Sequence, residues 1–179
     1  MSGRRSEVDP TGTDSSGTAP IDIFLPDADA TASLARALAQ TQPARAVVHL
    51  HGELGAGKST LGRAWLRALG VSGAIRSPTY TLVERYPLRD GGEALHLDLY
   101  RIGNAAELEF LGLDDADARL WLVEWPERGL TALPAADLRV ELTVEGDGRR
   151  CRLVAASPEG KDWLAAPDLE SRLRIFPES

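Results

Sequence analysis

The stretch from His51 to Thr60, HGELGAGKST, is the most informative segment of this 179-residue chain. Gly52, Gly57 and the Lys-Ser pair that follows match the pattern G-x-x-x-x-G-K-[ST] without a gap. The apolar run AVVHL comes directly before the stretch, and apolar residues at helical spacing come directly after it. A buried strand, a glycine-rich loop and a helix in this order are typical of a P-loop, which holds a phosphate chain.

The residue types of this loop suit a polyphosphate with a magnesium ion. Glycine permits backbone conformations in which successive N–H groups converge on an anion, and the following helix adds a partial positive charge. Lys58 supplies a cation for the β- and γ-phosphates, and Ser59 supplies a hydroxyl where Mg²⁺ is expected. We therefore expect the phosphates to be bound by Gly52, Glu53, Leu54, Gly55, Ala56, Gly57, Lys58, Ser59 and Thr60.

A P-loop alone indicates a nucleoside triphosphate and Mg²⁺, but it does not indicate a particular reaction. The sequence contains neither N-K-x-D, the usual guanine-reading motif, nor L-S-G-G-Q, the motif of transporter-type ATPases. The absence of N-K-x-D disfavours a GTPase, and the absence of L-S-G-G-Q disfavours a transporter-type ATPase. The chemistry of the loop does not by itself separate ATP from GTP.

Two acidic residues lie at or near the ends of apolar runs, Asp98 in LHLDLY and Glu124 in WLVEW. Open α/β sheets bind their ligands at the carboxyl ends of strands, and Mg²⁺ takes oxygen ligands. We expect one acid to lie on the metal side and the other to orient water, so that Lys58, Asp98 and Glu124 form the catalytic set. Ser59 and the two acids are then the expected metal ligands. The alternative is an acidic residue on the outward face of an alternating strand.

The segment SPTYT, residues 77–81, supplies three Ser and Thr hydroxyls beside a proline. Those of Ser77, Thr79 and Thr81 could gather around a γ-phosphate and its Mg²⁺, as a switch-like loop that orders only with a triphosphate. On chemistry alone, an ordinary loop leading into a strand is the favoured interpretation.

Composition divides the chain into three regions. Residues 1–19 are rich in Ser, Gly, Thr, Asp and Pro, which predicts a disordered tail. Residues 20–166 alternate helix and strand patterns early and form hairpins later, one of them pairing YTLVERY with ALHLDLY. This order predicts a single α/β domain with a mixed parallel and antiparallel sheet. Residues 167–179 are expected to form a loose C-terminal tail.

The charge balance bears on possible partners. The formal net charge is -7, whereas a protein that grips a nucleic-acid backbone by itself usually presents a basic face. We therefore expect no DNA partner and no autonomous RNA binding. No stretch approaches the roughly 20 apolar residues of a membrane span, and the lone Cys151 suits a reducing cytosol. These features predict a cytoplasmic protein without membrane contact.

Four segments in series carry a family resemblance: GELGAGKST, SPTYTLVERY, HLDLYRI with ELEFLGL behind it, and LVEWPERG. Over about residues 45–130 this combination closely resembles the bacterial TsaE family, the small ATPases of tRNA threonylcarbamoyladenosine biosynthesis. The resemblance implies a P-loop NTPase-like three-layer domain, MgATP binding and weak hydrolysis by the protein alone. It also implies partnership with TsaD and TsaB, which carry out the transfer step, so that tRNA is reached only through those partners.

The same resemblance implies roles for single residues. Lys58 would bind the phosphates, and Ser59 would be the Mg²⁺ hydroxyl at a position where many members carry Thr. Asp98 would be the Walker-B-like acid near Mg²⁺, and Glu124 the second acid, which could orient water.

Four further family positions are less distinctive. Thr79 and Thr81 would belong to a switch-like loop. Trp125 would line the nucleotide or a partner surface, although packing is the favoured interpretation for a Trp beside Pro126. His96 is also a family position, and a structural role is favoured for a histidine within a strand.

Two other functions remain open at this point. A P-loop small-molecule kinase would need a mobile lid that carries arginines over the transferred phosphate. The late arginine-containing stretches RDGGE, ERG and GDGRRCR are better explained as turns. A nucleotide-sensing scaffold, in which hydrolysis is incidental, would keep its partner function after loss of Glu124.

Overall fold

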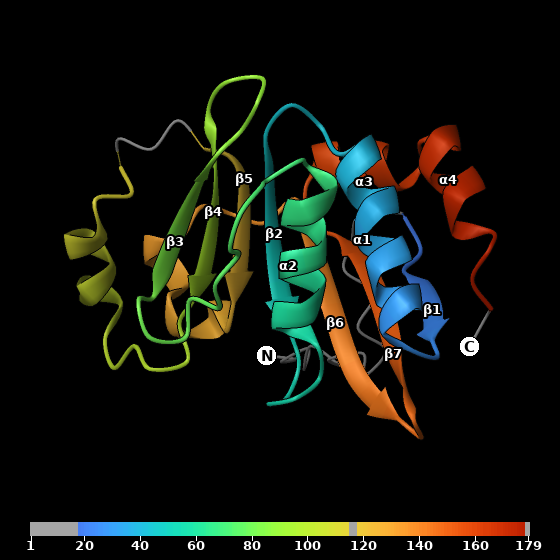
Figure 1. The fold of residues 1–179 in the computed structure, drawn as a ribbon, viewed down its shortest axis with the longest axis horizontal. Helices are drawn as coiled ribbons and strands as arrows, with labels where there is room; N and C mark the ends of the chain where they lie inside the picture. Colours follow the sequence, from blue (N-terminus) through green and yellow to red (C-terminus); the bar gives the residue numbers. More distant parts are fainter. Residues whose placement is uncertain (1–17, 115–117, 178–179) are drawn as a thin grey trace, which may run out of the picture.

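The computed structural model describes residues 18–114 and 118–177, in which the strands form one seven-stranded sheet of order β1-β7-β6-β2-β5-β4-β3 (Figure 1). Pairs β2–β5, β2–β6 and β4–β5 are parallel, whereas β1–β7, β6–β7 and β3–β4 are antiparallel. This mixed sheet confirms the predicted α/β class. The strands are β1 (Ile21–Leu25), β2 (Ala46–His51), β3 (Val83–Pro87), β4 (Glu93–Asp98), β5 (Ala118–Glu124), β6 (Leu138–Glu145) and β7 (Gly148–Ala155).

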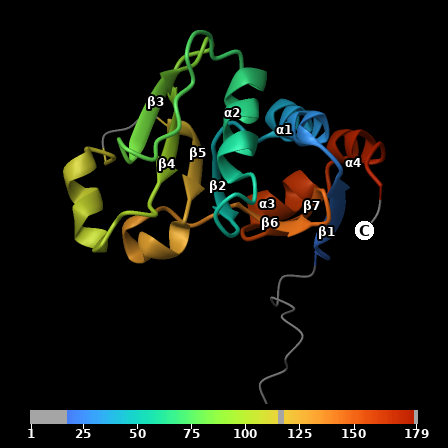
Figure 2. The same ribbon diagram turned by 60° about the horizontal axis from the view of Figure 1, so that its bottom comes forward.

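Helices cover the two faces of the sheet unequally (Figure 2). The α-helices pack with strands of both halves of the sheet into the larger apolar core, and the 3₁₀ segments pack against β4 and β5 in a second, smaller core. The third layer is therefore built from short 3₁₀ turns rather than from α-helices. The α-helices are α1 (Ala28–Thr41), α2 (Lys58–Ala68), α3 (Pro158–Leu164) and α4 (Pro167–Leu173), and the 3₁₀ segments are η1 (Ala105–Leu111), η2 (Pro126–Arg128) and η3 (Leu130–Ala132).

Two buried tryptophans hydrogen-bond to the C-terminal end of α1. The indole N–H of Trp65 in α2 donates to Gln42 Oε1 at 2.7 Å, and that of Trp163 in α3 donates to Thr41 Oγ1 at 3.0 Å. The two rings meet edge to face with centroids 6.0 Å apart. Because both N–H groups are satisfied, the large apolar rings are buried without the cost of an unpaired donor.

Strand alternation carries the site residues to one edge of the sheet. Asp98 and Glu124 are the last residues of the parallel neighbours β4 and β5, and they lie opposite one another in the register. Since side chains two residues apart share a face, His96 lies on the same face as Asp98. That face packs against α2, whose N-terminus follows the glycine loop.

Two boundaries differ from the sequence-based expectations. Residues 167–179 do not form a loose tail throughout, because Pro167 begins α4 and its residues Leu169 and Leu173 are buried against the main core. The spacing of these leucines is helical, and α1 provides the surface that buries them. Strand β3 begins at Val83 rather than at residue 80, after a turn in which Leu82 takes a φ of 66°. The expected disordered tail, residues 1–19, falls almost entirely outside the described residues.

Among residues 18–114 and 118–177, none of the helices combines the length and apolarity that crossing a bilayer requires.

Truncating a buried side chain of α4 tests the revised C-terminal boundary. Leu169→Ala removes a side chain that is 0% exposed, so the free energy of unfolding should fall by about 2–5 kcal/mol. Ile175→Ala, which truncates a side chain that is 74% exposed, is the control and should change little. Urea unfolding followed by circular dichroism measures both, and equal stabilities of the two variants would show that α4 is not part of the folded core.

Candidate functional site

The glycine loop leaves β2 and turns tightly into α2. A Cβ atom at Gly52 would lie 2.4 Å from the carbonyl oxygen of Leu142 in β6, so the backbone passes β6 at a distance that only glycine allows. Gly57 precedes α2 with a φ of 106° and supplies no side-chain cap. The first N–H groups of α2 therefore have no cap from this residue, and the helix presents the positive end of its dipole at this point.

Lys58 is the first residue of α2, and its side chain turns back into the glycine loop. Its ammonium donates to the carbonyl oxygens of Gly52 at 2.5 Å and Glu53 at 2.9 Å, and it lies 4.4 Å from the centroid of the Trp125 ring. Burial lowers the pKa of Lys58, while the nearby carboxylates of Glu124 and Asp98 act in the opposite direction. A buried cation held beside two acids is the arrangement that a phosphate chain with a divalent cation would complement.

Glu124 is bonded from two directions at the end of β5. Its Oε2 accepts a hydrogen bond from the Ser59 hydroxyl at 2.9 Å, and its Oε1 lies 2.7 Å from Nε2 of His96. The side chains of Glu124 and His96 are 3% and 0% exposed. Burying a carboxyl group this deeply is costly unless it is hydrogen-bonded, and these two partners meet that requirement.

Asp98 is held by the loop that precedes β3. Its Oδ2 accepts from Thr79 Oγ1 at 3.1 Å, and its Oδ1 accepts from the backbone N–H of Tyr100 at 3.0 Å. Ser77 joins the same chain of contacts, because its hydroxyl lies 2.7 Å from that of Thr79. Two of the three hydroxyls expected in the switch-like loop are therefore connected to the acid at the end of β4.

The third hydroxyl of that loop points elsewhere. Thr81 donates to the carboxylate of Glu84 at 2.8 Å in an exposed contact. Tyr80 is 82% exposed and stacks with Arg101, whose guanidinium lies 4.8 Å from the ring centroid. The structure therefore does not bring Thr81 to the two acids, although the loop that carries it does reach them through Thr79.

Two neighbouring hollows flank the loop. The first measures about 220 Å³ and is lined by Leu54, Gly55, Gly57, Lys58, Ser59, Thr60, Thr79, Asp98, Tyr100, Glu124 and Trp125. The second measures about 180 Å³, lies between the start of α1 and the β6–β7 turn, and shares Gly57 and Thr60 with the first. A ligand with a charged part and an uncharged part could thus occupy both hollows across the start of α2.

His96 and Arg149 both contact parts of the site. The structural role that the sequence favours for His96 fits its hydrogen bond with Glu124, and its position two residues before Asp98 on a strand places it beside the acids. A Cβ atom at Gly62 in α2 would lie 2.9 Å from His96 Nε2, so this helix carries glycine where the imidazole passes. Arg149, placed only in a turn, donates from Nε to Ala56 O at 3.1 Å and from Nη2 to Gly55 O at 3.2 Å. No local pattern signals that contact.

A scan of protein-family models matches residues 25–152 to the family described as "Threonylcarbamoyl adenosine biosynthesis protein TsaE". A TsaE protein of Haemophilus influenzae is 43% identical over 123 residues, which are 67% of this chain and 77% of that protein. A TsaE protein of Rickettsia felis is 32% identical over 155 residues, 83% of this chain and 90% of the relative. The crystal structure of Bacillus subtilis YdiB superposes with a TM-score of 0.68 at 24% identity, covering 88% of this chain and 96% of that one, and shares its fold.

The half-buried His49 in β2 makes the stability of the folded chain dependent on pH. Burial, followed by the nearby His51, lowers the pKa of His49 from 6.5 to about 4. Between these values the unfolded chain binds a proton on this imidazole that the folded chain does not bind, so its contribution to stability is present above pH 6.5 and is lost as the pH falls toward 4. His49→Asn should flatten the pH dependence of the free energy of unfolding across this window. Urea titrations at several pH values measure it, and parallel curves for the two proteins would contradict the shift.

Proposed function

Because this chain belongs to the TsaE family of threonylcarbamoyl adenosine biosynthesis proteins, we propose that it binds and slowly hydrolyses MgATP as an accessory in threonylcarbamoyl modification of tRNA. The observation that carries the proposal is the convergence of three kinds of group at the N-terminus of α2. These are the glycine loop with Lys58, the Ser59 hydroxyl, and the two acids Asp98 and Glu124.

The two hollows suit the two parts of ATP. The first presents backbone N–H groups, a helix N-terminus and a lysine, which together favour a polyphosphate. The second adjoins it at Gly57 and Thr60 and combines the apolar Leu25 and Pro26 with polar groups, so it suits the nucleoside. Lys58 would then exchange its bonds to loop carbonyls for stronger bonds to phosphate oxygens.

The donor set fits a magnesium ion. The Ser59 hydroxyl and the carboxylates of Glu124 and Asp98 are hard oxygen donors in the same hollow. Within the described ranges, no three His, Cys, Asp or Glu side chains gather as a metal-binding cluster. That suits Mg²⁺, which is commonly held by one or two carboxylates, substrate phosphates and water. When bound, the ion would neutralise charge on the phosphate oxygens.

Different residues of the chain would bind the cation and the phosphates. Ser59 and Glu124 lie together and would hold the cation, while His96 fixes the orientation of the Glu124 carboxylate from behind. Asp98 contacts Thr79, so it would connect the cation site with the loop of residues 77–81. Lys58 is the one basic side chain among the described residues that line the first hollow. An arginine supplied by a partner raises rates by about 10³–10⁵ in related P-loop systems, so the lone chain should be slow.

Partner proteins complete this proposal, and we take them to be TsaB and TsaD. Leu54 and Tyr100, which line the first hollow, are 64% and 37% exposed, and Tyr80 on the neighbouring loop is 82% exposed. Exposed apolar side chains around a nucleotide site suit a protein surface that docks there. With a net charge of -7, the chain would reach tRNA through such partners, in the cytoplasm, rather than by gripping the backbone itself.

The structure gives the kinase alternative little support. Arg149 of the GDGRRCR stretch donates to loop carbonyls, and Arg128 of the ERG stretch stacks on Tyr100 with its guanidinium 5.4 Å from the ring centroid. Neither is arranged as a lid over a transferred phosphate. Incubation with labelled ATP and common metabolites distinguishes the two, because a kinase yields a phosphorylated metabolite and an ATPase yields free phosphate.

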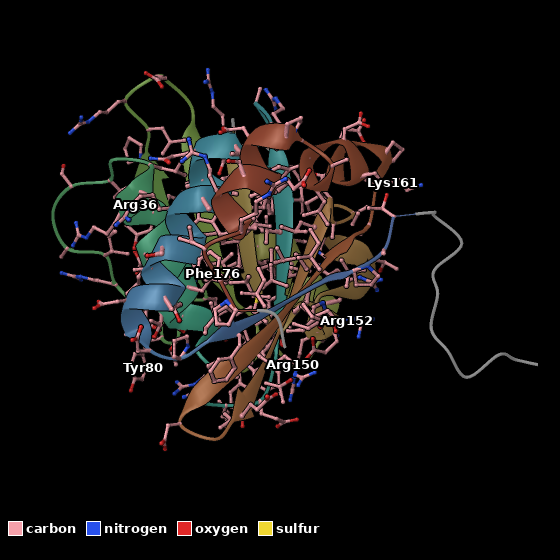
Figure 3. All side chains as sticks on the ribbon, turned by 90° about the vertical axis from the view of Figure 1, so that its right-hand side faces the viewer. Arg36, Tyr80, Arg150, Arg152, Lys161 and Phe176 are labelled. Carbon is pink, nitrogen blue, oxygen red and sulfur yellow. The ribbon has the colours of Figure 1, made fainter. Side chains whose placement is uncertain are left out.

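Replacing Lys58 tests the proposed function. Lys58→Ala should reduce phosphate release from MgATP by on the order of 100-fold, because it removes the buried cation that stabilises the transferring phosphoryl group. Modification of tRNA by the mixture with TsaB and TsaD should fall with it. Lys161→Ala is the matched control, since Lys161 lines neither hollow. It lies on α3, across the view from Tyr80 of the loop of residues 77–81 (Figure 3). Full modification by Lys58→Ala would exclude a nucleotide-driven role.

A pair of threonine substitutions tests the connection between Asp98 and its loop. Thr79→Val removes a hydrogen bond to a charged group and should lower phosphate release by about tenfold in the assembled complex. Thr81→Val removes the same hydroxyl from an exposed contact with Glu84 and should leave the rate near that of the unchanged protein. Equal effects of the two substitutions would show that the hydroxyl of Thr79 has no special part in turnover.

A further inference from the structure

We propose that Arg149 is a positioning residue that holds the glycine loop in its phosphate-binding conformation, an inference that rests on the proposed binding of MgATP. Arg149 is the second residue of β7, and it reaches the loop across 93 residues of sequence. Its Nε donates to Ala56 O at 3.1 Å and its Nη2 donates to Gly55 O at 3.2 Å. One planar guanidinium thus holds two successive carbonyls of the loop.

Holding these carbonyls also fixes the N–H groups of the loop. In a planar trans peptide the C=O and the following N–H point in opposite directions. The bond to Ala56 O therefore sets the direction of the Gly57 N–H, and Gly57 lines both hollows. Gly57 has a φ of 106° and no side chain that could hold it, so its orientation depends on outside contacts.

The position of Arg149 is itself fixed by packing at the β6–β7 turn. Its Nη1 donates to Gly148 O at 2.7 Å. A Cβ atom at Gly148 would lie 2.6 Å from Leu25 O and 2.7 Å from the Phe24 ring, so the turn lies tightly against β1. The guanidinium therefore starts from a well-supported backbone, which keeps the entropy lost on forming its two loop contacts small.

The guanidinium of Arg149 hydrogen-bonds to the loop and not to the acids of the site. A loop carbonyl that accepts from the guanidinium is turned toward Arg149, so it is not free to turn its oxygen toward a phosphate, which that oxygen would repel. Removing the guanidinium frees these peptides to rotate. The free-energy cost of ordering them again then reduces the free energy of nucleotide binding. We expect weaker binding of nucleotides that carry a β-phosphate, without loss of the fold.

The test compares Arg149→Met with Arg152→Met in the full chain. Both remove a positive charge from β7, but Arg152 is exposed and, three residues further along the strand, lies on its other face. Affinity for MgADP is measured by calorimetry, and hydrogen exchange of the loop amides is followed by mass spectrometry. Arg149→Met should weaken MgADP binding by about tenfold and speed exchange at residues 55–57, whereas Arg152→Met should change neither.

Two further variants separate this inference from the proposed function. Arg149→Lys keeps the charge but offers one ammonium in place of the planar fork, so it should recover only part of the affinity. If Lys58→Ala loses MgADP binding while Arg149→Met and Arg149→Lys both bind as the unchanged protein does, the positioning role is overturned and the nucleotide site stands. If Lys58→Ala also binds normally, the proposed function itself fails. Should Arg149→Met not fold, the affinity and loop exchange of Arg149→Lys decide.

Discussion

The buried carboxylate of Glu124 is the point at which three parts of the fold are joined. It accepts from Ser59 at the start of α2 and lies against His96 of β4, while it belongs itself to β5. An unpaired charge at this depth would be costly, so the three elements must be in register for the carboxylate to be satisfied. This requirement couples correct packing of α2 on the sheet to correct assembly of the site.

The two halves of the sheet contribute differently to that site. The parallel strands β4 and β5 end in the two acids, as expected where ligands bind at the carboxyl ends of strands. The antiparallel hairpin of β6 and β7 supplies no acid but supports the glycine loop from outside, through the close approach of Gly52 to Leu142 and the contacts of Arg149. One half therefore provides chemical groups, and the other provides the rigidity that holds the loop facing them.

What the sequence predicts well depends on neighbours along the chain. The loop, the strand before it, the helix after it and the acids at strand ends all follow from local patterns, and the structure places them as those patterns indicate. The role of Arg149 could not be predicted, since it depends on a contact 93 residues away. The helix α4 was missed because two leucines indicate a helix only when a partner such as α1 buries them. The exposed position of Thr81 likewise depends on the turn at Leu82, which composition does not reveal.

The close approach of Gly62 to His96 has an evolutionary consequence. Glycine inside a helix is disfavoured by about 1 kcal/mol relative to alanine, so drift toward alanine would ordinarily be expected at this position. The added Cβ would meet the imidazole at 2.9 Å, and that imidazole is held by Glu124. A larger residue at position 62 therefore requires the imidazole to move or to be absent, and either change alters its contact with Glu124. Substitutions at positions 62 and 96 are then expected to be correlated among related sequences, although the two residues lie on different elements.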